Sequence, residues 1–510
     1  MGARIEVRVD AGDAEPVQEF ARSQCDPGDG GVYAAGRPAR ADPRRQWRRH
    51  GFGVRETRTA WRLQQQSQRD GTGSEHLSPS GRDTRRDLCA GVHGWHGDDG
   101  ATGFPRGPRG MNRRRVKITG IGFVTPAGVG KEEFWGGIQQ SVSRVTKLVR
   151  FPDGAGAFVG AEVSGFKLER FVAGLNTKRM PRHTHFAVAA AAMAVEDAGF
   201  SLPDLKNANP LVMIGATLMD FGAINKGVDM ILRHGPMSAL PTSVSSALVS
   251  GIGAAVGDVI GGTTRTMSLQ SACCSGLDAI GRAADLIASG EVDLAICGGT
   301  EAPLHFHPML ELRIAGLAPS NPELPERQCR PFDRWRTTGV IGEGACVLVL
   351  EPDQSSRTAY AYVDGHGYAS DIPGSPCSGI REAMRLAVGN SGMRPTDVEA
   401  VSAWGPGHKR LDAAEAEAMR VFYGRHLDSL PVTSLKGAIG NPLGAAGAIQ
   451  AGCAALGLKN GCLPPTVNWE HPDPACLLNL SSKARLISHR SILINAHGLS
   501  GTNACLLLTR

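Results

Sequence analysis

The sequence predicts an α/β protein with a mostly parallel sheet and two similar halves. From residue 116 onward, short apolar runs that suit buried strands alternate with segments whose apolar residues recur at helical spacing. The resulting order of strand, helix, strand, helix is typical of the α/β class. The same order returns after residue 360. Two similar halves imply a pseudo-twofold core whose functional loops meet at strand ends.

The first half is organised around the sequence SACCSG (271–276), which predicts a sharp turn. A strand with apolar residues is predicted before it, at 267–270. A helix is predicted after it, because apolar residues recur at helical spacing from Leu277 onward, and Gly290 is expected to end this helix. A second buried strand is predicted at 294–299.

Cys273 lies in this turn and is the candidate nucleophile. A thiol at a strand-to-helix turn faces the N–H groups and the positive dipole end of the helix, and both favour the thiolate over the thiol. The same N–H groups can hold an oxyanion when the thiolate attacks a carbonyl. The stretch also allows a buried structural cysteine, since free cysteines are among the most buried residues. Cys274 is expected to be inert, because its side chain points away from the target of its neighbour.

The remaining elements follow in order along the chain. In the first half we expect helices at 131–138 and 184–198 and strands at 116–125, 211–214 and 346–351. In the second half we expect a helix at 380–389 and strands at 360–367, 398–404, 431–436, 491–495 and 504–508. A Gly-rich segment, GAIGNPLGAAGA (437–448), takes the place that the cysteine turn has in the first half.

Composition limits the classes of function. The net charge of +6 is small for 510 residues and indicates no nucleic-acid-binding stripe. Twelve cysteines occur without a CxxC motif or paired spacing, which is typical of a reducing cytoplasm. The most apolar run, at 247–257, is too short to span a bilayer, and no signal peptide is visible.

Residues 1–110 differ from the rest of the chain. They contain eighteen arginines and no lysine, and no apolar period persists in them. The basic sequence RRQWRRH (44–50) allows an arm that contacts nucleic acid or an anionic surface. We instead predict a disordered leader, or translated upstream sequence with a wrongly chosen start, because nothing in it can form a core. Met111, directly before a well-patterned strand, is a credible start.

Several segments, in order along the chain, carry a resemblance to a known family. They are VTPAGVGKEEFW (124–135), SACCSG with GGTEA downstream, RPFDRWRTTGVIGEGACVLVLE (330–351), SLKGAIGNPLGAAGA (434–448), LPPTVN (463–468) and HGLSGTNACLLL (497–508). With them, residues 114–510 resemble a β-ketoacyl-acyl carrier protein synthase of the elongating type, in the thiolase-fold superfamily. The resemblance implies a thiolase-like fold with mixed sheets in a layered αβαβα arrangement, with halves at 111–358 and 359–510.

The family implies an acyltransferase of fatty acid or polyketide biosynthesis whose acyl chains are carried by acyl carrier protein. It also implies a dimer, either a homodimer or a heterodimer with another ketosynthase. No cofactor, metal, nucleic acid or membrane span is expected. Thiolases proper match less well, because HGLSGTN lacks the second cysteine that they use there.

By this resemblance, Cys273 is the nucleophile, and its backbone N–H and that of Leu499 form the oxyanion hole. Leu499 stands where the family has a Phe that gates the acyl pocket, and Leu218 is expected to line the same pocket. Lys436 and Asp412 match a catalytic Lys and a catalytic Asp of the family.

Other positions depart from the family pattern. Both catalytic histidines of the family are replaced, one by Trp404 in the sequence AWGPGH and the other by Asn441 in GNPLG. Two threonines that contact pantetheine in the family become Pro406 and His408. An acidic residue of the family is Gln450 here.

The replacements remove titratable side chains from two predicted catalytic positions. Neither an indole nor an amide titrates near pH 7, and general acid–base help is worth roughly 10²–10⁴-fold, so condensation should be badly slowed. Trp404 and Asn441 can still donate hydrogen bonds to an enolate oxygen if the indole leaves room. The other interpretation is that Trp404 fills the malonyl pocket. His408 and His497 lie near these motifs and are candidate substitute bases.

Two functions of different class follow from the sequence. The first is an acyltransferase that loads an acyl chain onto Cys273, with condensation impaired or altered. The second is a non-catalytic partner subunit, like the chain-length factors that pair with an active ketosynthase. The retained cysteine favours the first function, and the lost histidines favour the second. A third, nucleic-acid-associated function would depend on the leader, where no patterned element occurs.

Overall fold

The computed structural model of the protein describes residues 113–510, apart from residues 150, 152–156, 174–176, 178, 179, 240–247, 262, 263, 322 and 489. The predictions for the leader at 1–110 and for Met111 fall outside the described residues. Within the described residues, no helix has the length and apolar character needed to cross a membrane.

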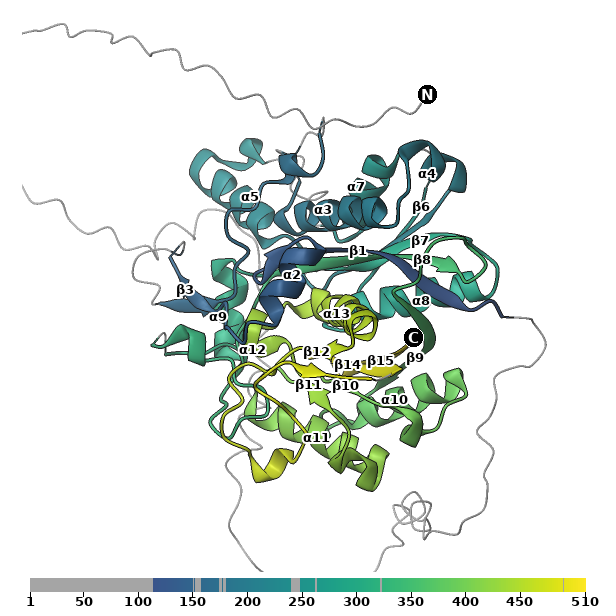
Figure 1. Cartoon of the computed structure of the whole chain (residues 1–510). Coiled ribbons are helices and arrows are strands. Elements are labelled where there is room, and N and C mark those ends of the chain that lie inside the picture. Colours follow the sequence, from purple (N-terminus) through teal and green to yellow (C-terminus); the bar gives the residue numbers. More distant parts are fainter. Residues whose placement is uncertain are drawn as a thin grey trace, which may run out of the picture. The chain divides into compact units, whose positions relative to one another are not determined.

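One mixed sheet runs through the described part of the chain (Figure 1). Its first half contains, in spatial order, β1 (Val116–Thr125), β8 (Gly344–Pro352), β7 (Ala295–Glu301), β5 (Leu211–Gly215) and β6 (Arg265–Leu269). Its second half contains, in spatial order, β9 (Ala361–Ser370), β15 (Thr502–Thr509), β14 (Ser491–His497), β10 (Val401–Ser402) and β11 (Val432–Thr433). A short antiparallel pairing of β1 with β9 joins the two halves.

The two halves of the sheet repeat one pattern of strand directions. In each half the first two pairs are antiparallel, β1–β8–β7 and β9–β15–β14. The last two pairs are parallel, β7–β5–β6 and β14–β10–β11. The mixed sheet implied by the family resemblance is confirmed, and the mostly parallel sheet predicted from the element order is wrong. Strands covered on both faces show continuous apolar runs, so this pattern did not reveal the direction of their neighbours.

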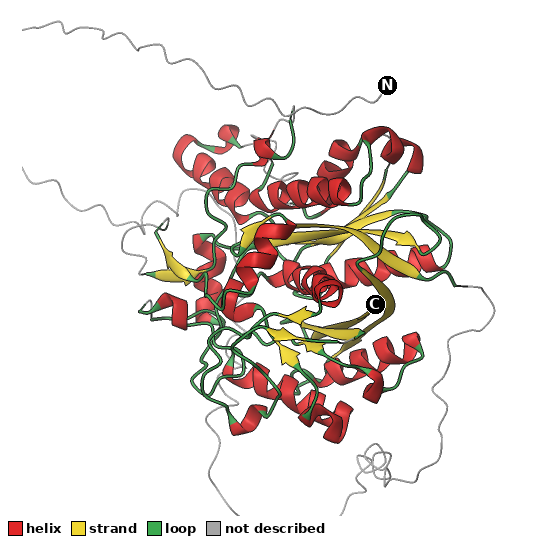
Figure 2. Cartoon of the chain, in the orientation of Figure 1, coloured by secondary structure: helices red, strands yellow, loops and turns green. Residues whose placement is uncertain are grey.

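Helices form three layers around the two halves of the sheet (Figures 1 and 2). The outer faces are covered on one side by α3 (Arg182–Asp197) and α7 (Ser250–Ile260), and on the other by α10 (Ser378–Ser391) and α11 (Lys409–Tyr423). Between the halves lie α8 (Ser275–Ala288) and α13 (Ala446–Asn460), in contact with each other. Close approach at their starts requires glycine, since a Cβ at Gly276 would lie 2.6 Å from the carbonyl oxygen of Gly444. This is the layered αβαβα arrangement.

Shorter elements complete the described structure. The helices among them are α2 (Lys131–Ile138), α4 (Leu202–Ala208), α5 (Phe221–His234), α9 (Phe306–Ile314) and α12 (Lys436–Ile439). The strand β2 (Gly128–Val129) pairs with β1. Two small sheets are formed by β3 (Thr146–Leu148) with β4 (Phe158–Gly160) and by β12 (Cys462–Leu463) with β13 (Arg485–Leu486).

Most of the predicted elements are present. The strand at 116–125 and the helix at 131–138 are confirmed with unchanged ends as β1 and α2. The strand predicted at 267–270 forms as β6, but at the edge of the sheet, where Met267 is 51% exposed. Its apolar side chain is therefore outside the core of this chain.

The strand predicted at 398–404 is much shorter than expected. Only β10 forms, and the chain turns away from the sheet after Ala403. The backbone N–H groups of Trp404 and Gly405 donate to the buried carboxylate of Glu415, both at 2.8 Å, instead of to a neighbouring strand. A carboxylate on α11 thus determines where this strand ends.

Candidate active site

Cys273 lies in a tight turn between β6 and α8. Ala272, just before it, has a left-handed φ of 53°, and the Ser275 hydroxyl accepts a hydrogen bond from the N–H of Ser271 at 2.9 Å. The turn leaves Cys273 only 1% exposed. Cys274 packs in the apolar core of the middle layer, whereas Cys273 belongs to a different apolar cluster.

The thiol of Cys273 differs from the activated thiol that its turn predicts. Burial raises the pKa of Cys273 to about 12, and the nearby Glu301 carboxylate adds to the increase. Backbone N–H groups of Leu499 and Cys273 donate to the sulfur and act in the opposite direction. The predicted preference for the thiolate is therefore wrong for the protein alone, because burial outweighs these donors. The two N–H groups are nevertheless those that the resemblance assigns to an oxyanion hole.

A narrow cavity reaches Cys273. Its volume is about 20 Å³, room for about one water molecule. Apolar residues of 312–317 and 338–341 form part of its wall. The rest of the wall includes Trp404, Pro406, His408, Asn441, Leu443 and Leu499. Four predicted site residues that are far apart in the sequence thus meet at one cavity, namely Cys273, Trp404, Asn441 and Leu499.

The indole of Trp404 is buried beside this cavity, with 1% exposed. It packs edge-to-face against the imidazole of His497, with the ring centroids 4.9 Å apart. Among the described residues, its buried Nε1–H finds no hydrogen-bond partner, although buried N–H groups are nearly always paired.

Asn441 lies on the turn between α12 and α13. Its N–H donates to the carbonyl of Val340 at 2.7 Å, and its own carbonyl accepts from the N–H of Gly342 at 2.9 Å. In the part of the chain that the structure describes, its side-chain Oδ1 is buried without a hydrogen-bond partner. Since the O and N atoms of an amide side chain are assigned from their hydrogen bonds, either end of this amide can face a ligand. Trp404 and Asn441 thus both line the cavity, and each carries one buried polar atom that lacks a partner among the described residues.

Asp412 was predicted as a catalytic residue, and the structure places it against the backbone instead of the cavity wall. Its buried carboxylate accepts from three N–H groups at 2.7 to 3.1 Å, those of Phe332, Gly407 and His408. Burial raises the pKa of Asp412 to about 7. These contacts position the loop that carries Trp404.

Glu415 is a buried residue of the same loop support that the sequence interpretation missed. It lies three residues after Asp412 on α11, so the two carboxylates share one side of the helix. Besides the two N–H groups at residues 404 and 405, it accepts from the side-chain NH₂ of Asn495 at 3.1 Å. Burial raises the pKa of Glu415. The i, i+3 spacing of two carboxylates was the signal in the sequence.

Lys436 lies at the start of α12 and is 1% exposed. Its Nζ donates to Oε1 of Gln450 at 3.0 Å. The NH₂ group of Gln450 donates in turn to backbone carbonyls, including that of Ala403 at 3.0 Å. Burial lowers the pKa of Lys436 to about 8, although Glu415 acts in the opposite direction. A neutral amide at position 450 supports the lysine charge less than a carboxylate would.

An apolar cluster surrounds Cys273. Its buried members include Leu148, Phe158, Leu304, Met309, Ile341 and Leu443. Leu218 packs against this cluster and is partly buried, and Leu499 is 50% exposed on the cavity wall. Such surroundings suit an apolar acyl chain.

Glu301 at the end of β7 is a second residue that the sequence interpretation missed. Its buried carboxylate accepts from the N–H groups of Thr217 at 2.7 Å, Leu218 at 3.2 Å and Gly444 at 3.1 Å. Burial raises the pKa of Glu301 to about 7. The contacts tie the segment of Leu218 to the turn before α13.

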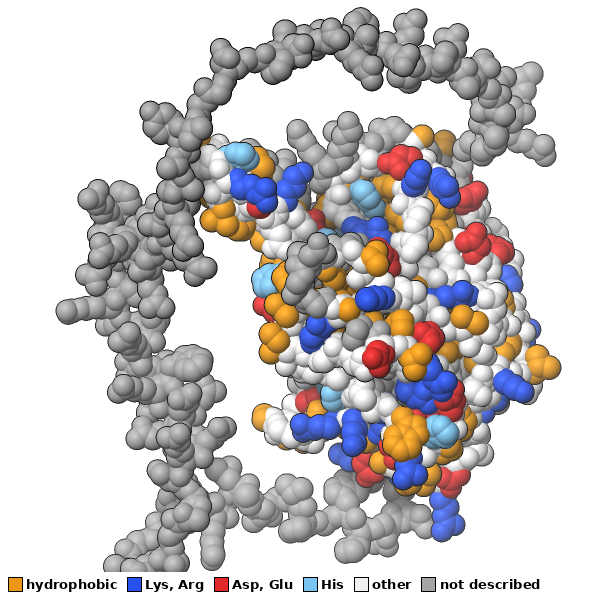
Figure 3. Space-filling model, turned by 90° about the vertical axis from the view of Figure 1, so that its left-hand side faces the viewer, with side chains coloured by type: hydrophobic (Ala, Val, Ile, Leu, Met, Phe, Trp, Pro, Cys, Tyr) orange, Lys and Arg blue, Asp and Glu red, His pale blue; other side chains and the backbone are white. Residues whose placement is uncertain are grey.

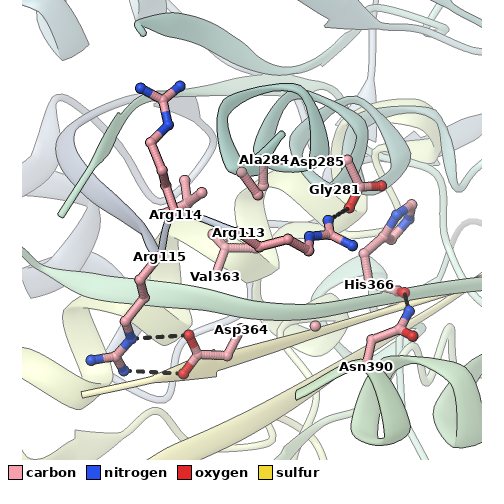
Figure 4. Close-up of a pocket in the computed structure, with 13 residues that line it drawn as sticks. Arg113, Arg114, Arg115, Gly281, Ala284, Asp285, Val363, Asp364, His366 and Asn390 are labelled. Atoms are coloured by element: carbon pink, nitrogen blue, oxygen red, sulfur yellow. Dashed lines mark hydrogen bonds and ion pairs between the residues drawn. The ribbon is translucent and has the colours of Figure 1, made fainter. Parts of the chain in front are cut away.

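A larger cavity of about 260 Å³, lined by other residues, lies between α8 and β9 (Figure 4). Two arginines on its wall are already paired, Arg113 with Asp285 at 2.9 Å and Arg115 with Asp364 at 3.1 Å. His366 also lines it. None of the predicted site residues borders this cavity.

Within the part of the chain that the structure describes, no group of His, Cys, Asp and Glu side chains is arranged to hold a metal ion. The cysteines in that part are free thiols. On the face shown in Figure 3, positive and negative side chains are interspersed and form no stripe of one sign.

Sequence similarity to known proteins agrees with the family that the motifs predicted. Residues 113–356 match the model of the beta-ketoacyl synthase N-terminal domain, and residues 359–470 match that of the C-terminal domain. The chain is 32% identical over 419 residues to the 3-oxoacyl-[acyl-carrier-protein] synthase 2 of Coxiella burnetii, with 78% of this chain and 99% of that protein covered. It is 32% identical over 422 residues to the putative polyketide beta-ketoacyl synthase 1 of Streptomyces virginiae, with 78% and 98% covered.

Similarity to solved structures points to the same family. The structure described as the ishigamide ketosynthase/chain length factor is similar, with a TM-score of 0.73 and 29% identity, and 78% of this chain and 99% of that chain are covered. A type II polyketide synthase acyl-carrier protein in complex with its ketosynthase is also similar, with a TM-score of 0.70 and 25% identity, and the same shares are covered. On these matches, over most of its length, the chain belongs to the beta-ketoacyl synthase family.

Proposed function

We propose that the protein is an acyltransferase of fatty acid or polyketide biosynthesis that loads an acyl chain from acyl carrier protein onto Cys273, with condensation impaired. The observation that carries the proposal is the buried Cys273 thiol at a cavity, with the N–H groups of Cys273 and Leu499 directed at its sulfur. The printed names of two relatives, a 3-oxoacyl-[acyl-carrier-protein] synthase and a ketosynthase in complex with acyl-carrier protein, support the choice of donor.

Acyl transfer follows from this geometry. The sulfur of Cys273 attacks the thioester carbonyl and forms a bond to the acyl carbon. The two backbone N–H groups stabilise the oxyanion that develops. The bond between the acyl carbon and the carrier sulfur then breaks, and the carrier thiol leaves with a proton. Because burial raises the pKa of Cys273, a base has to accept the proton of its thiol.

The same site is poorly equipped for condensation. The Nε1–H of Trp404 and the side-chain NH₂ of Asn441 can donate to a substrate oxygen, but neither side chain transfers protons near neutral pH. The indole also forms part of the wall of a cavity of only about 20 Å³, so a malonyl group requires the cavity to widen. We therefore expect loading with little or slow condensation.

A non-catalytic partner subunit is the second candidate function. The exposed strand β6 at the edge of the sheet favours it, because such an edge presents unpaired backbone groups to a second chain. Similarity to a structure named as a ketosynthase/chain length factor supports the same idea. In this case the protein would pair with an active ketosynthase instead of acting alone.

Incubation with acyl-loaded carrier protein, followed by peptide mass spectrometry, tests the proposal. We expect the acyl mass on the peptide that contains Cys273 and its loss in Cys273→Ala. Cys274→Ala is the matched control and should still load, because Cys274 lies in another cluster. An unacylated wild type would overturn the acyltransferase proposal. A stable complex with a ketosynthase that has both histidines would then support the partner-subunit function.

A further inference from the structure

We infer that His497 is the acid–base residue of acyl transfer, which accepts the proton of the Cys273 thiol and delivers it to the departing carrier thiol. The inference rests on the proposed acyltransferase function and adds a residue to it. It answers the need for a titratable group that Trp404 and Asn441 leave open.

His497 packs behind the wall of the active-site cavity. It ends β14, is 3% exposed, and packs on the indole that lines the Cys273 cavity. The next residue, Gly498, lies against the cysteine turn, where a Cβ would be 3.3 Å from the backbone nitrogen of Cys273. The N–H of Leu499 then faces the Cys273 sulfur. Residues 497–499 thus supply an imidazole and an oxyanion donor from one short segment.

Hydrogen bonds determine which ring nitrogen of His497 can accept a proton. Its Nδ1 lies 2.8 Å from Oδ1 of Asn503. The NH₂ group of Asn503 donates to Oδ1 of Asp371 at 2.7 Å and to the carbonyl of Gly501 at 3.2 Å, so its oxygen has to face the ring. Nδ1 of the neutral ring therefore carries the hydrogen, and Nε2 keeps its lone pair.

Asp371 holds the amide that faces the His497 ring. Its Oδ1 accepts from the NH₂ group of Asn503 at 2.7 Å, and its Oδ2 lies 3.7 Å from Nδ1 of His497. Asp371 is fixed by the N–H groups of Cys377 at 3.0 Å and Gly379 at 2.8 Å, where α10 begins. Charged groups near this part of the site also include Glu415 on α11, Lys436 on α12 and Glu301 at the end of β7.

His408, the other candidate base, caps a helix with its ring. It is the N-cap of α11, and its Nδ1 accepts from the N–H groups of Arg410 at 3.2 Å and Leu411 at 3.3 Å. The hydrogen of its neutral ring is therefore on Nε2, which can donate a hydrogen bond but cannot accept a proton. Burial, Arg410 and Arg336 lower the pKa of His408, which further disfavours its charged form.

The proposed proton path balances in both steps. As the bond from Sγ of Cys273 to the acyl carbon forms, the thiol proton moves to Nε2 of His497. When the bond from the acyl carbon to the carrier sulfur breaks, Nε2–H returns the proton to that sulfur. One thiol and one thioester enter, and one thioester and one thiol leave.

The test is the rate of single-turnover loading from acyl-carrier protein between pH 5.5 and 9 (a range chosen around the ordinary histidine pKa of about 6.5). We expect the wild-type rate to rise with pH through a histidine-like inflection. His497→Phe and His497→Gln should load roughly 10²–10⁴-fold more slowly and lack the inflection. His307→Gln is the matched control and should keep the wild-type profile, because His307 is half-exposed on α9 and does not line the Cys273 cavity.

A rescue experiment and a second variant distinguish a catalytic role of His497 from a structural one. Added imidazole should restore part of the rate in His497→Ala, which a purely structural role would not produce. His497→Gln keeps a hydrogen-bonding side chain, so it carries the test if His497→Phe unfolds. A wild type that loads, with histidine variants of equal rate and pH profile, would overturn this inference alone. A wild type that does not load would overturn the acyltransferase proposal together with it.

Discussion

The carboxylate of Glu415 is hydrogen-bonded to the backbone N–H of Trp404 at 2.8 Å. The same carboxylate binds the N–H of Gly405 at 2.8 Å, and neither bond involves the indole. The loop is therefore anchored independently of the side chain that it presents to the Cys273 cavity. The side chain at position 404 therefore determines the chemistry of this part of the cavity wall, while the backbone of its loop is held by a separate anchor.

Removal of that anchor should destabilise the fold. Glu415→Ala leaves two backbone donors and the NH₂ of Asn495 buried without their acceptor. We expect a loss of about 3 kcal/mol in the free energy of unfolding, measured by urea denaturation. Glu417→Ala, at an exposed position of the same helix, is the control and should change stability by less than about 0.5 kcal/mol. Equal effects of the two substitutions would contradict the anchoring role.

Lys436 should make stability depend on pH in the alkaline range. Its pKa falls from 10.5 to about 8 on folding, so between these values the unfolded chain binds more protons than the folded one. Stability should therefore rise with pH across this window, by about 3 kcal/mol at most. The measurement is the free energy of unfolding of wild type minus that of Lys436→Met from pH 7 to 10.5. Subtraction removes the contributions of other titrating groups.

Gln450→Glu provides the matched comparison for Lys436. A carboxylate 3.0 Å from Nζ would raise the lysine pKa toward its unfolded value. The rise in stability above pH 8 should then shrink or vanish. An unchanged slope would show that the amide at position 450 does not control the charge of Lys436.

Local sequence patterns predicted where helices and strands lie better than they predicted how long a strand runs or how neighbouring strands are directed. β1 and α2 were predicted with their observed ends, because apolar spacing and turn residues act within a few positions. The shortened β10 was not foreseen, since its end depends on a carboxylate at residue 415 that reaches back to residues 404 and 405. Strand direction was not foreseen either, because it depends on contacts far apart in the sequence.

For the candidate site, motifs predicted which residues lie together but not the burial and hydrogen bonds that set their chemistry. Motifs predicted that Cys273, Trp404, Asn441 and Leu499 belong together, and they line one cavity. The raised pKa of Cys273 was not predicted, because it comes from burial by residues of several elements. Nor did the sequence distinguish His408 from His497 as a base. Only the hydrogen bonds of the folded chain show that the His408 ring caps a helix, whereas Nδ1 of His497 faces Oδ1 of Asn503.

Cysteine reactivity should depend on the reagent. Burial and the raised pKa of Cys273 disfavour alkylation, whereas Cys462 is partly exposed. We therefore expect iodoacetamide to modify Cys462 ahead of Cys273, and an acyl-carrier protein to acylate Cys273 instead. Quantitative mass spectrometry of the two peptides after each treatment measures this. Faster alkylation of Cys273 would mean that its thiol ionises more readily than its burial implies.

Restoration of the two histidines should decide how far condensation has been lost. Trp404→His with Asn441→His returns titratable groups to the cavity and removes the bulk of the indole, while Cys273, Lys436 and Asp412 are still present. We expect the wild type to load acyl groups with little β-ketoacyl product and the double variant to form more. Recovery should be partial, since Gln450, Pro406 and His408 remain. The measurement is product formation from malonyl- and acyl-carrier protein across pH.

The pH profile of this reaction distinguishes the possible roles of the two replaced positions. If the indole and amide still bind the enolate oxygen, the wild type should condense slowly, and the double variant should add the pH dependence of histidines near neutrality to that rate. If the indole blocks the malonyl group, Trp404→Ala alone should permit slow product formation, because it opens the cavity without adding a base. Rapid condensation by the wild type with a histidine-like profile would contradict both. It would extend the role of His497 from loading to the condensation step, and His497→Gln should then abolish both activities.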